Sequence, residues 1–295
     1  MPSLDLLFLK NPLVLLLDRL GVKFFAFPIT KFAKARMEER LSEMSSKQDS
    51  GPDESSSRTD LLSMFLKAKA DRPDFMNDQR VLTMAVSMAF AGSETTAISL
   101  AAVFYYLLRN PRCYEKLMQE LNDAVQEGKI QNRPSGLVSW SESQTLPYLD
   151  ACIKESFRVH PSAGLPLERV VPPQGMDIDG HFIPGGTIVG VSAWVIHKRE
   201  DVFGKDVDAF IPERWLDCTK EQRKEMEATM FQFGAGARTC IGKNISLLEV
   251  YKLVPAFLRR FEVEFADSSK DWKLHNAWFV KQRDFYTRFS ARTLA

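Results

Sequence analysis

A glycine-rich loop around Cys240 contains the residues of this sequence that are best suited to chemistry. It spans residues 233–242 and reads Phe-Gly-Ala-Gly-Ala-Arg-Thr-Cys-Ile-Gly. Its glycines permit tight turns and a close approach of the backbone to a ligand, and the helical pattern that follows favours a thiolate at Cys240 through the helix dipole. Arg238 offers a planar fork suited to carboxylates. A lone cysteine is more often an inert core residue, but this spacing predicts a thiolate held against a large, flat, anionic ligand.

A second polar cluster interrupts the long helix that the sequence predicts over residues 77–110. That helix is apolar on most faces, so it is expected to be buried. In its middle, the run Ala91-Gly92-Ser93-Glu94-Thr95-Thr96 places a glycine, a carboxylate and hydroxyl groups in apolar surroundings, which is costly unless they serve a purpose. These residues alone leave two interpretations open: a helix distortion or internally satisfied polar network, or a functional acid–alcohol pair.

Two further motifs carry charged residues in patterns that suggest mutual pairing. A helix predicted over residues 146–159 carries Glu155 and Arg158 three residues apart, on one face. A later segment reads Pro212-Glu213-Arg214-Trp215. On a solvated surface the helical pair would contribute at most about 1 kcal/mol. Three charged groups can be buried together only if they satisfy one another.

The content and order of these motifs resemble the cytochrome P-450 family. The cysteine loop matches the family signature Phe-x-x-Gly-x-Arg-x-Cys-x-Gly at its five fixed positions, Phe233, Gly236, Arg238, Cys240 and Gly242. The polar cluster is similar to the family's oxygen-binding motif, Glu155 and Arg158 to its Glu-x-x-Arg motif, and residues 212–215 to its Pro-Glu-Arg-Phe segment with Trp in place of Phe. The resemblance implies a mainly α fold with a small β region.

The resemblance also implies a role for each candidate residue. Cys240 would be the axial thiolate of haem iron, and therefore the metal ligand. Glu94 and Thr95 would be the catalytic pair that delivers protons to dioxygen, whereas Glu155, Arg158 and Arg214 would form a buried structural support for the loop. The cofactor-binding residues would be Arg169, Phe233, Gly234, Arg238, Cys240 and Gly242. The substrate pocket would include Ala91, Gly92, Ala163, Gly164, Leu165 and Trp278.

The activity that the resemblance implies is haem-thiolate monooxygenation, with insertion of one oxygen atom from O₂ into an apolar organic substrate in fungal specialised metabolism. Electrons would come from NADPH through a separate flavoprotein, an NADPH–cytochrome reductase, because the sequence contains no Gly-x-Gly-x-x-Gly motif. Two alternatives remain: a truncated, non-catalytic haem-binding fragment, and a family member that rearranges or dehydrates its substrate without a reductase. The pair Glu94 and Thr95 favours dioxygen activation over the latter.

The predicted organisation is a single partial domain over residues 1–295, with the family fold N-terminally incomplete. We expect a flexible linker at about 45–58, followed by a short helix that Thr59 caps. The turn Asp179-Gly180 predicts a tight hairpin over residues 176–183. By resemblance the protein would lie at the endoplasmic reticulum surface, with a peripheral membrane contact through residues 1–30. We identify no membrane anchor, so the alternative location is the cytoplasm.

Composition excludes several other classes of protein. The chain has 295 residues, with 39 Lys and Arg against 38 Asp and Glu, so it lacks the basic excess expected of a nucleic-acid-binding protein. Its four cysteines are widely spaced, which fits a reducing compartment and argues against a disulfide framework or a zinc site. The four histidines show no metal-ligand spacing and are interpreted as structural or surface residues.

Overall fold

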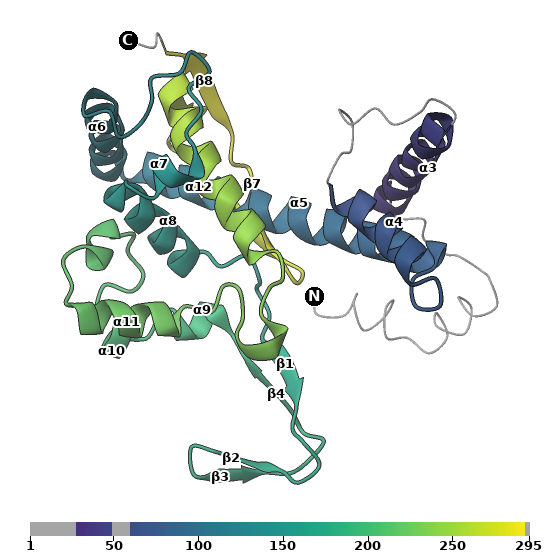
Figure 1. Cartoon of the computed structure of the whole chain (residues 1–295). Helices are drawn as coiled ribbons and strands as arrows, with labels where there is room; N and C mark the ends of the chain where they lie inside the picture. The colour runs from purple at the N-terminus through teal and green to yellow at the C-terminus, as the bar shows by residue number, and fades with distance from the viewer. Residues whose placement is uncertain (1–27, 49–59, 293–295) are drawn as a thin grey trace. The chain divides into compact units, whose positions relative to one another are not determined.

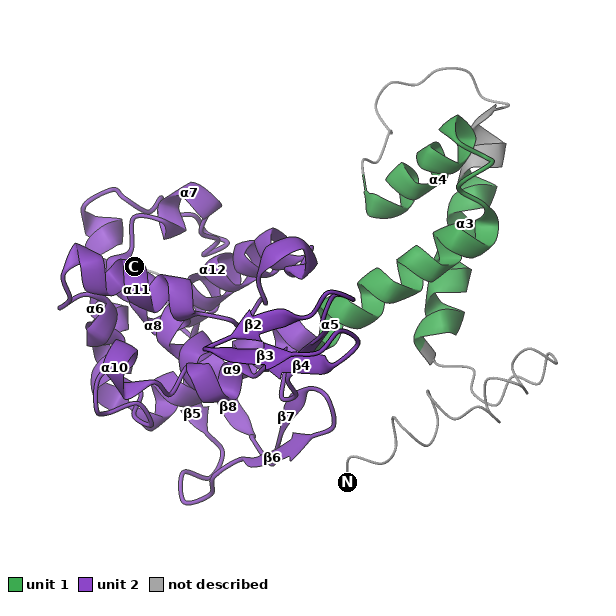
Figure 2. Cartoon of the chain, turned by 90° about the horizontal axis from the view of Figure 1, so that it is seen from below, with its two compact units in different colours: residues 1–94 green, residues 95–295 purple. Residues whose placement is uncertain are grey.

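The computed structural model describes residues 28–48 and 60–292 (Figure 1). The chain divides into two compact units, Met1–Glu94 and Thr95–Ala295 (Figure 2), and each is described by itself. Helices predominate and the strands are short, so the expected mainly α fold with a small β region is confirmed. Most of the predicted linker and residues 1–27 of the predicted membrane contact at residues 1–30 lie outside the described residues.

The first unit contains α3 (Pro28–Gln48), α4 (Leu61–Asp71) and the N-terminal part of α5 (Asp78–Arg109). Helix α3 continues to Gln48, four residues into the segment predicted as a linker. The predicted cap of α4 was wrong by one residue, because Asp60, not Thr59, is the N-cap and accepts a hydrogen bond from the backbone N–H of Ser63. A small core of Met37, Leu66, Met76 and Val81 joins the three helices.

Helix α5 has nearly the predicted bounds, but its predicted burial is wrong for the first half. Val81 is buried, whereas the residues from Thr83 to Ser93 are exposed or half-buried, with Phe90 50% exposed. Among the described helices, α5 alone is long and apolar enough to cross a membrane, a criterion of length and composition that core helices also meet. Its C-terminal half behaves as a core helix, since Val103 and Leu107 are completely buried.

The second unit is built around a core shared by four helices: the C-terminal half of α5, α6 (Pro111–Gln126), α8 (Pro147–Val159) and α12 (Lys243–Arg260). Pro111 and Pro147 begin their helices, where a missing N–H costs nothing. The carboxylate of Glu120 accepts hydrogen bonds from the backbone N–H groups of Tyr148 and Leu149, at 2.7 and 2.8 Å. This contact fixes the start of α8 against α6. A short helix, α7 (Trp140–Ser143), begins with a capping box.

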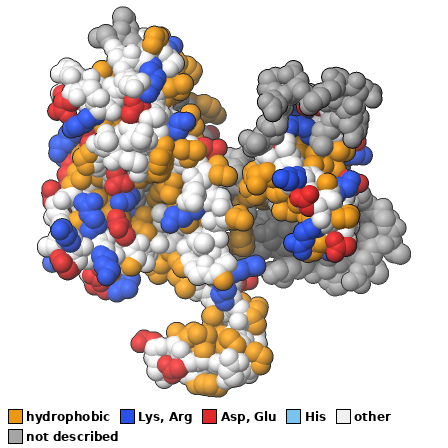
Figure 3. Space-filling model, in the orientation of Figure 1, with side chains coloured by type: hydrophobic (Ala, Val, Ile, Leu, Met, Phe, Trp, Pro, Cys, Tyr) orange, Lys and Arg blue, Asp and Glu red, His pale blue; other side chains and the backbone are white. Residues whose placement is uncertain are grey.

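Within the described residues the strands form antiparallel pairs, of which β1–β4 and β2–β3 extend away from the helices (Figure 1). The pairs are β1 (Leu167–Val170) with β4 (Ile188–Val191), β2 (Met176–Ile178) with β3 (His181–Ile183), β5 (Phe261–Phe265) with β8 (Thr287–Ala291), and β6 (Lys273–Asn276) with β7 (Val280–Arg283). The predicted β2–β3 hairpin is confirmed, with positive φ at both Asp179 and Gly180. It exposes apolar side chains (Figure 3), and Phe182 is 69% exposed.

The remaining short elements lie between β4 and α12 along the chain. They are α9 (Ala193–Ile196), α10 (Glu200–Phe203), the 3₁₀ turn η2 (Pro212–Trp215), α11 (Lys220–Thr229) and the 3₁₀ turn η3 (Gly236–Arg238). A second, smaller core of Ala151, Phe203, Val207, Trp215 and Met226 packs α8, α10, η2 and α11 together.

Candidate functional site

The cysteine loop is closed by hydrogen bonds within itself. The backbone N–H of Cys240 donates to the carbonyl of Phe233 at 2.8 Å, and the hydroxyl of Thr239 donates to the same carbonyl at 3.3 Å. Gly234 and Gly236 adopt φ of +66° and +67°, a conformation that residues with a Cβ avoid. The chain therefore turns back on itself so that both ends of the loop are joined, with Cys240 at the second end.

The sulfur of Cys240 lies on an open surface. Of the four cysteines, all within the described residues, only Cys240 is exposed. A Cβ added at Gly236 would meet no atom within 4 Å, and one at Gly242 would lie 3.9 Å from Sγ of Cys240. The neighbouring Ile241 is 92% exposed. An accessible sulfur beside an exposed apolar residue and side-chain-free glycines is a surface that a flat, largely apolar ligand fits.

A single cysteine without other protein ligands is the expected donor set for haem. In the described residues, no three His, Cys, Asp or Glu side chains are grouped so that they could hold a metal ion. Zinc requires three or four protein ligands, and this site does not offer them. In haem the macrocycle itself supplies most of the ligands of the iron, so one thiolate from the protein would suffice. The residues present therefore fit a haem group.

Strand β1 contacts the cysteine loop and orients Arg169. A Cβ on Gly234 would lie 3.2 Å from Cδ1 of Leu167, so this side chain faces the loop. Side chains alternate across a strand, and Arg169 consequently leaves β1 on the same face as Leu167. Arg169 and Arg238 are both exposed, and neither has an ion pair with a described acidic side chain. The guanidinium of Arg169 donates a hydrogen bond of 2.7 Å to the carbonyl of Glu168, and neither arginine has its charge compensated by a described carboxylate.

The predicted pairing of Glu155, Arg158 and Arg214 is confirmed. The side chains of Glu155 and Arg158 are 0% exposed and form a two-point ion pair, with Nη2–Oε1 and Nε–Oε2 distances of 2.7 and 2.9 Å. Nε of Arg214 lies 2.9 Å from the same Oε1. The carboxylate also accepts hydrogen bonds from the backbone N–H of Ile211 and the indole of Trp215. The interpretation as a solvated surface pair is therefore excluded.

Arg158 and Arg214 also organise the loops between α9 and η2. Arg158 donates to the carbonyls of His197, Val207 and Ala209 at 3.1, 2.7 and 2.9 Å, and Arg214 donates to the carbonyl of Asp206 at 2.9 Å. Each buried guanidinium nitrogen thus has a partner, which burial of such a charge requires. That this network supports the cysteine loop remains a prediction. His197 is relevant to it, because its ring bonds the backbones of both Arg158 and Phe231.

His197 is one of the four histidines interpreted as structural or surface residues, and it is structural, but its contacts were not predicted. Its imidazole is completely buried and bonds the backbone of Arg158 on one side and of Phe231 on the other. Burial lowers the pKa of His197 to about 4, so the ring is neutral at physiological pH. Histidine spacing could not reveal it, because both of its partners are backbone groups of distant segments.

The polar cluster of α5 occupies continuous helix, without an interruption at Gly92. Ala91 and Gly92 are exposed, while Glu94 and Thr95 are half-buried. The boundary between the units falls between Glu94 and Thr95. In the second unit the next residue, Thr96, is buried and donates a hydrogen bond of 3.2 Å to the hydroxyl of Ser246 in the first turns of α12. The end of the cluster therefore contacts the helix that follows Cys240.

Four residues predicted to line the substrate pocket come together at one place in the second unit. The N–H of Gly164 donates to the carbonyl of Trp278 at 2.8 Å, and the amide of Asn276 donates to the carbonyl of Gly164 at 3.1 Å. Ala163 and Leu165 flank this contact. Trp278 has φ of +101°, which is an outlier for a bulky residue and marks a constrained turn. Leu165 and Trp278 are 40% and 44% exposed.

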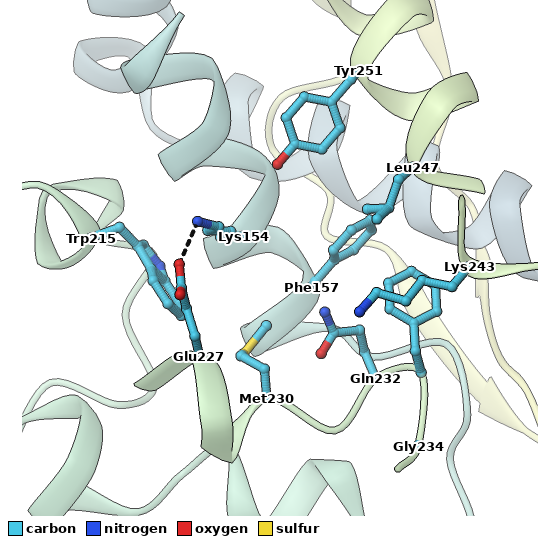
Figure 4. Close-up of a pocket in the computed structure, with 11 residues that line it drawn as sticks. Lys154, Phe157, Trp215, Glu227, Met230, Gln232, Gly234, Lys243, Leu247 and Tyr251 are labelled. Atoms are coloured by element: carbon cyan, nitrogen blue, oxygen red, sulfur yellow. Dashed lines mark hydrogen bonds and ion pairs between the residues drawn. The ribbon is translucent and has the colours of Figure 1, made fainter. Parts of the chain in front are cut away.

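A separate cavity of about 300 Å³ lies between α8, α11, α12 and the start of the cysteine loop (Figure 4). The ammonium of Lys154 pairs with Glu227 at 2.8 Å on one side of it, and Oε1 of Gln232 is buried there without a partner among the described residues. The cavity shares Phe233 and Gly234 with the loop, but none of the predicted substrate-pocket residues line it. It is therefore distinct from the predicted substrate pocket.

Comparisons with known proteins agree with this geometry. The sequence model of the family described as Cytochrome P-450 matches residues 2–287. The cytochrome P-450 monooxygenase cicH of Emericella nidulans is 44% identical over 292 residues, which cover 99% of this chain and 55% of that protein. A cytochrome P-450 monooxygenase of Aspergillus terreus is 44% identical over 265 residues, 89% of this chain and 51% of that protein. The chain thus spans about half the length of these curated relatives. With its signature cysteine exposed on a glycine loop and its Glu-x-x-Arg pair buried, the chain belongs to the cytochrome P-450 family.

Proposed function

We propose that this chain carries the haem-thiolate site of a monooxygenase that inserts one oxygen atom from O₂ into an apolar organic substrate, in fungal specialised metabolism. The observation that carries the proposal is the exposed sulfur of Cys240 on a loop without other metal ligands. Membership of the family implies a haem cofactor. Relatives named cytochrome P-450 monooxygenases, all from fungi, support the reaction class.

The residues that would hold the haem lie in or beside the loop. Cys240 would bind the iron, and Gly242 would leave room beside the sulfur. Phe233 and Gly234 would shape the surface, and the exposed guanidinium groups of Arg169 and Arg238 would pair with propionates. When bound, haem with a thiolate ligand supplies dioxygen activation, because the thiolate donates electron density that favours O–O cleavage.

The other candidate residues would control protons and substrate. Glu94 and Thr95 would hold and deliver protons as a positioned acid and alcohol. Within the second unit the apolar substrate would be held by Ala163, Gly164, Leu165 and Trp278. Ala91 and Gly92 belong to the first unit, and their role as pocket residues comes from the family motif alone. A Cβ at Gly92 would meet no atom within 4 Å, so the helix presents open space at that position.

The electron donor would be NADPH, acting through a separate flavoprotein reductase, as the family resemblance implies. Exposed apolar surface on the β2–β3 hairpin (Figure 3) and the apolar residues 1–30 support a location at the endoplasmic reticulum surface. Recruitment to vesicles of the endoplasmic reticulum lipid composition would test that location.

The direct test is the absorption spectrum of the purified, haem-reconstituted chain after reduction under carbon monoxide. We expect a thiolate-type Soret band that Cys240→Ser abolishes and that the matched variant Cys218→Ser retains. Since Cys240 is exposed, its replacement should leave the unfolding free energy nearly unchanged. Absence of haem uptake by the wild-type chain would refute the proposal, whereas a Soret band without product formation would favour the non-catalytic haem-binding fragment. Product formation with NADPH and a reductase would then test the monooxygenase reaction itself.

A further inference from the structure

His197 connects the buried ion-pair network to the cysteine loop. It follows α9 and is 0% exposed. Its Nδ1 atom lies 3.0 Å from the backbone carbonyl of Arg158, and its Nε2 atom lies 2.7 Å from the backbone nitrogen of Phe231. The carbonyl can only accept a hydrogen bond and the peptide N–H can only donate one. The ring must therefore carry its proton on Nδ1 and accept at Nε2, which fixes one neutral tautomer.

From Phe231 the contacts continue to the sulfur-bearing residue. The carbonyl of Phe231 accepts a hydrogen bond of 2.9 Å from the N–H of Gly234, which shapes the first turn of the loop. The carbonyl of Phe233 accepts the N–H of Cys240 at 2.8 Å. His197 thus fastens the segment that leads into the loop to the backbone of Arg158, and that segment in turn fastens Cys240.

The other end of this connection is rigid. Arg158 is held by Glu155 and by three backbone carbonyls, with its side chain fully buried in α8. A histidine is suited to bridge this anchor and the loop because its donor and acceptor nitrogens lie on opposite sides of a rigid ring. Gln or Asn can replace one of the two contacts, and Phe can replace neither.

We propose that His197 is a positioning residue, which sets the location of the Cys240 loop relative to α8 through paired backbone hydrogen bonds. This inference rests on the proposed role of Cys240 as the haem ligand. His197 does not touch the reacting atoms. Its effect would be to restrict the motion of the cysteine backbone and to keep the hydrogen-bonding environment of the sulfur uniform.

The test measures amide hydrogen exchange in the haem-free chain of 295 residues, so it does not depend on haem binding. His197→Phe should accelerate exchange at Phe231 and Cys240 by roughly fivefold or more, as expected for the loss of one hydrogen bond. His197→Gln, which can still accept from Phe231, should restore part of the protection. The matched control is His160→Phe, another completely buried histidine, whose ring contacts Val280 and Gln282 and not the loop.

A second readout uses the haem-loaded chain. His197→Phe should broaden or shift the thiolate-type Soret band under carbon monoxide, while His160→Phe should leave its position unchanged. Unaltered exchange at the Cys240 amide in both His197 variants would overturn the inference, as would equal effects of His197→Phe and His160→Phe. If His197→Phe does not fold, the comparison of His197→Gln with His160→Gln decides the question. Failure of the wild-type chain to give the Soret band would overturn the proposed function and leave the exchange result standing.

Discussion

The indole N–H of Trp215 donates a hydrogen bond of 2.9 Å to Oε2 of Glu155 in the interior of the second unit. The resemblance drawn from the sequence places this tryptophan where the family segment has phenylalanine, which has no such donor. Glu155 therefore accepts from two arginines, one backbone N–H and one indole, and its two oxygens are fully engaged. The tryptophan both fills the second core and adds a donor to a buried charge.

Replacement of Trp215 with Phe should be destabilising by about 1–3 kcal/mol, because a hydrogen bond to a buried charged group is lost and a small cavity is left. Denaturant unfolding of the purified chain measures this change. The matched control is Trp194→Phe, which removes an indole hydrogen bond to the neutral carbonyl of Pro161 and should cost about 1 kcal/mol. An effect of Trp215→Phe no larger than that of Trp194→Phe would contradict the prediction.

Arg158→Lys should be strongly destabilising despite the retained charge. Arg158 satisfies three backbone carbonyls and both oxygens of Glu155 through three separate nitrogens, and a single ammonium cannot reach all of them. We expect a loss of about 3–5 kcal/mol in unfolding free energy, or recovery only as insoluble protein. Arg112→Lys is the control, since that arginine pairs with Glu213 at the surface and its replacement should change stability by less than about 1 kcal/mol.

Stability should fall as the pH decreases from about 6.5 to about 4. Burial lowers the pKa of both His160 and His197 to about 4 in the folded protein, while unfolded histidine titrates near 6.5. In this window the unfolded chain binds protons that the folded chain does not, so protonation favours unfolding. Each histidine contributes about 3 kcal/mol to the pH dependence of the free energy of unfolding. This contribution is present above pH 6.5 and is lost as the pH falls to about 4.

Urea unfolding at a series of pH values measures how the free energy of unfolding changes with pH. Glu142 and Glu213 have pKa values lowered to about 2, so their stabilising contributions are lost only below about pH 4.5 and do not obscure the histidine window. His197→Gln should remove about half of the pH dependence, and the double variant with His160→Gln nearly all of it. If the free energy of unfolding of the wild-type chain does not change between about pH 6.5 and 5, the prediction is wrong.

The glycines of the cysteine loop should differ in their tolerance of alanine. Gly242 has φ of −83°, and an added Cβ would make only an ordinary van der Waals contact with Sγ of Cys240 at 3.9 Å, so Gly242→Ala should be almost neutral for folding. Gly236→Ala should cost about 1–2 kcal/mol because of its positive φ alone. Gly234→Ala should cost more, since its Cβ would also approach Leu167 to 3.2 Å. Thermal unfolding of the three variants gives the order, and any other order would refute the role assigned to backbone strain.

Local signals in the sequence predicted much of the fold. The helix predicted over residues 146–159 is found as α8, and Asp179-Gly180 forms the expected hairpin, because helical periodicity and turn residues act over a few neighbouring positions. The cap of α4 was misplaced by one residue because Thr59 and Asp60 are both good caps. Sequence preference does not distinguish them, whereas the contact of Asp60 with the Ser63 N–H does.

Properties that depend on distant contacts were harder to predict. The pairing of Glu155 with Arg158 follows from helical spacing, and the addition of Arg214 came from the resemblance. The bridging role of His197 joins backbone atoms at positions 158 and 231, which no local pattern encodes. The exposure of Phe90 on α5 is a further example. Apolar periodicity predicts which face of a helix is suited to burial, but it does not show whether other described residues pack against that face.

The contact at Gly164 has a consequence for how such a protein could change its choice of substrate. A methyl group at this position would lie 2.5 Å from side-chain atoms of both Asn276 and Val280, so even alanine would force the 276–280 turn outward. Residues 163–165 and 276–280 can therefore lie this close together only because residue 164 is glycine. In the proposed substrate pocket, variation would therefore be confined to exposed side chains such as Leu165 and Trp278, because the contact between the two segments leaves no space for a larger residue at position 164.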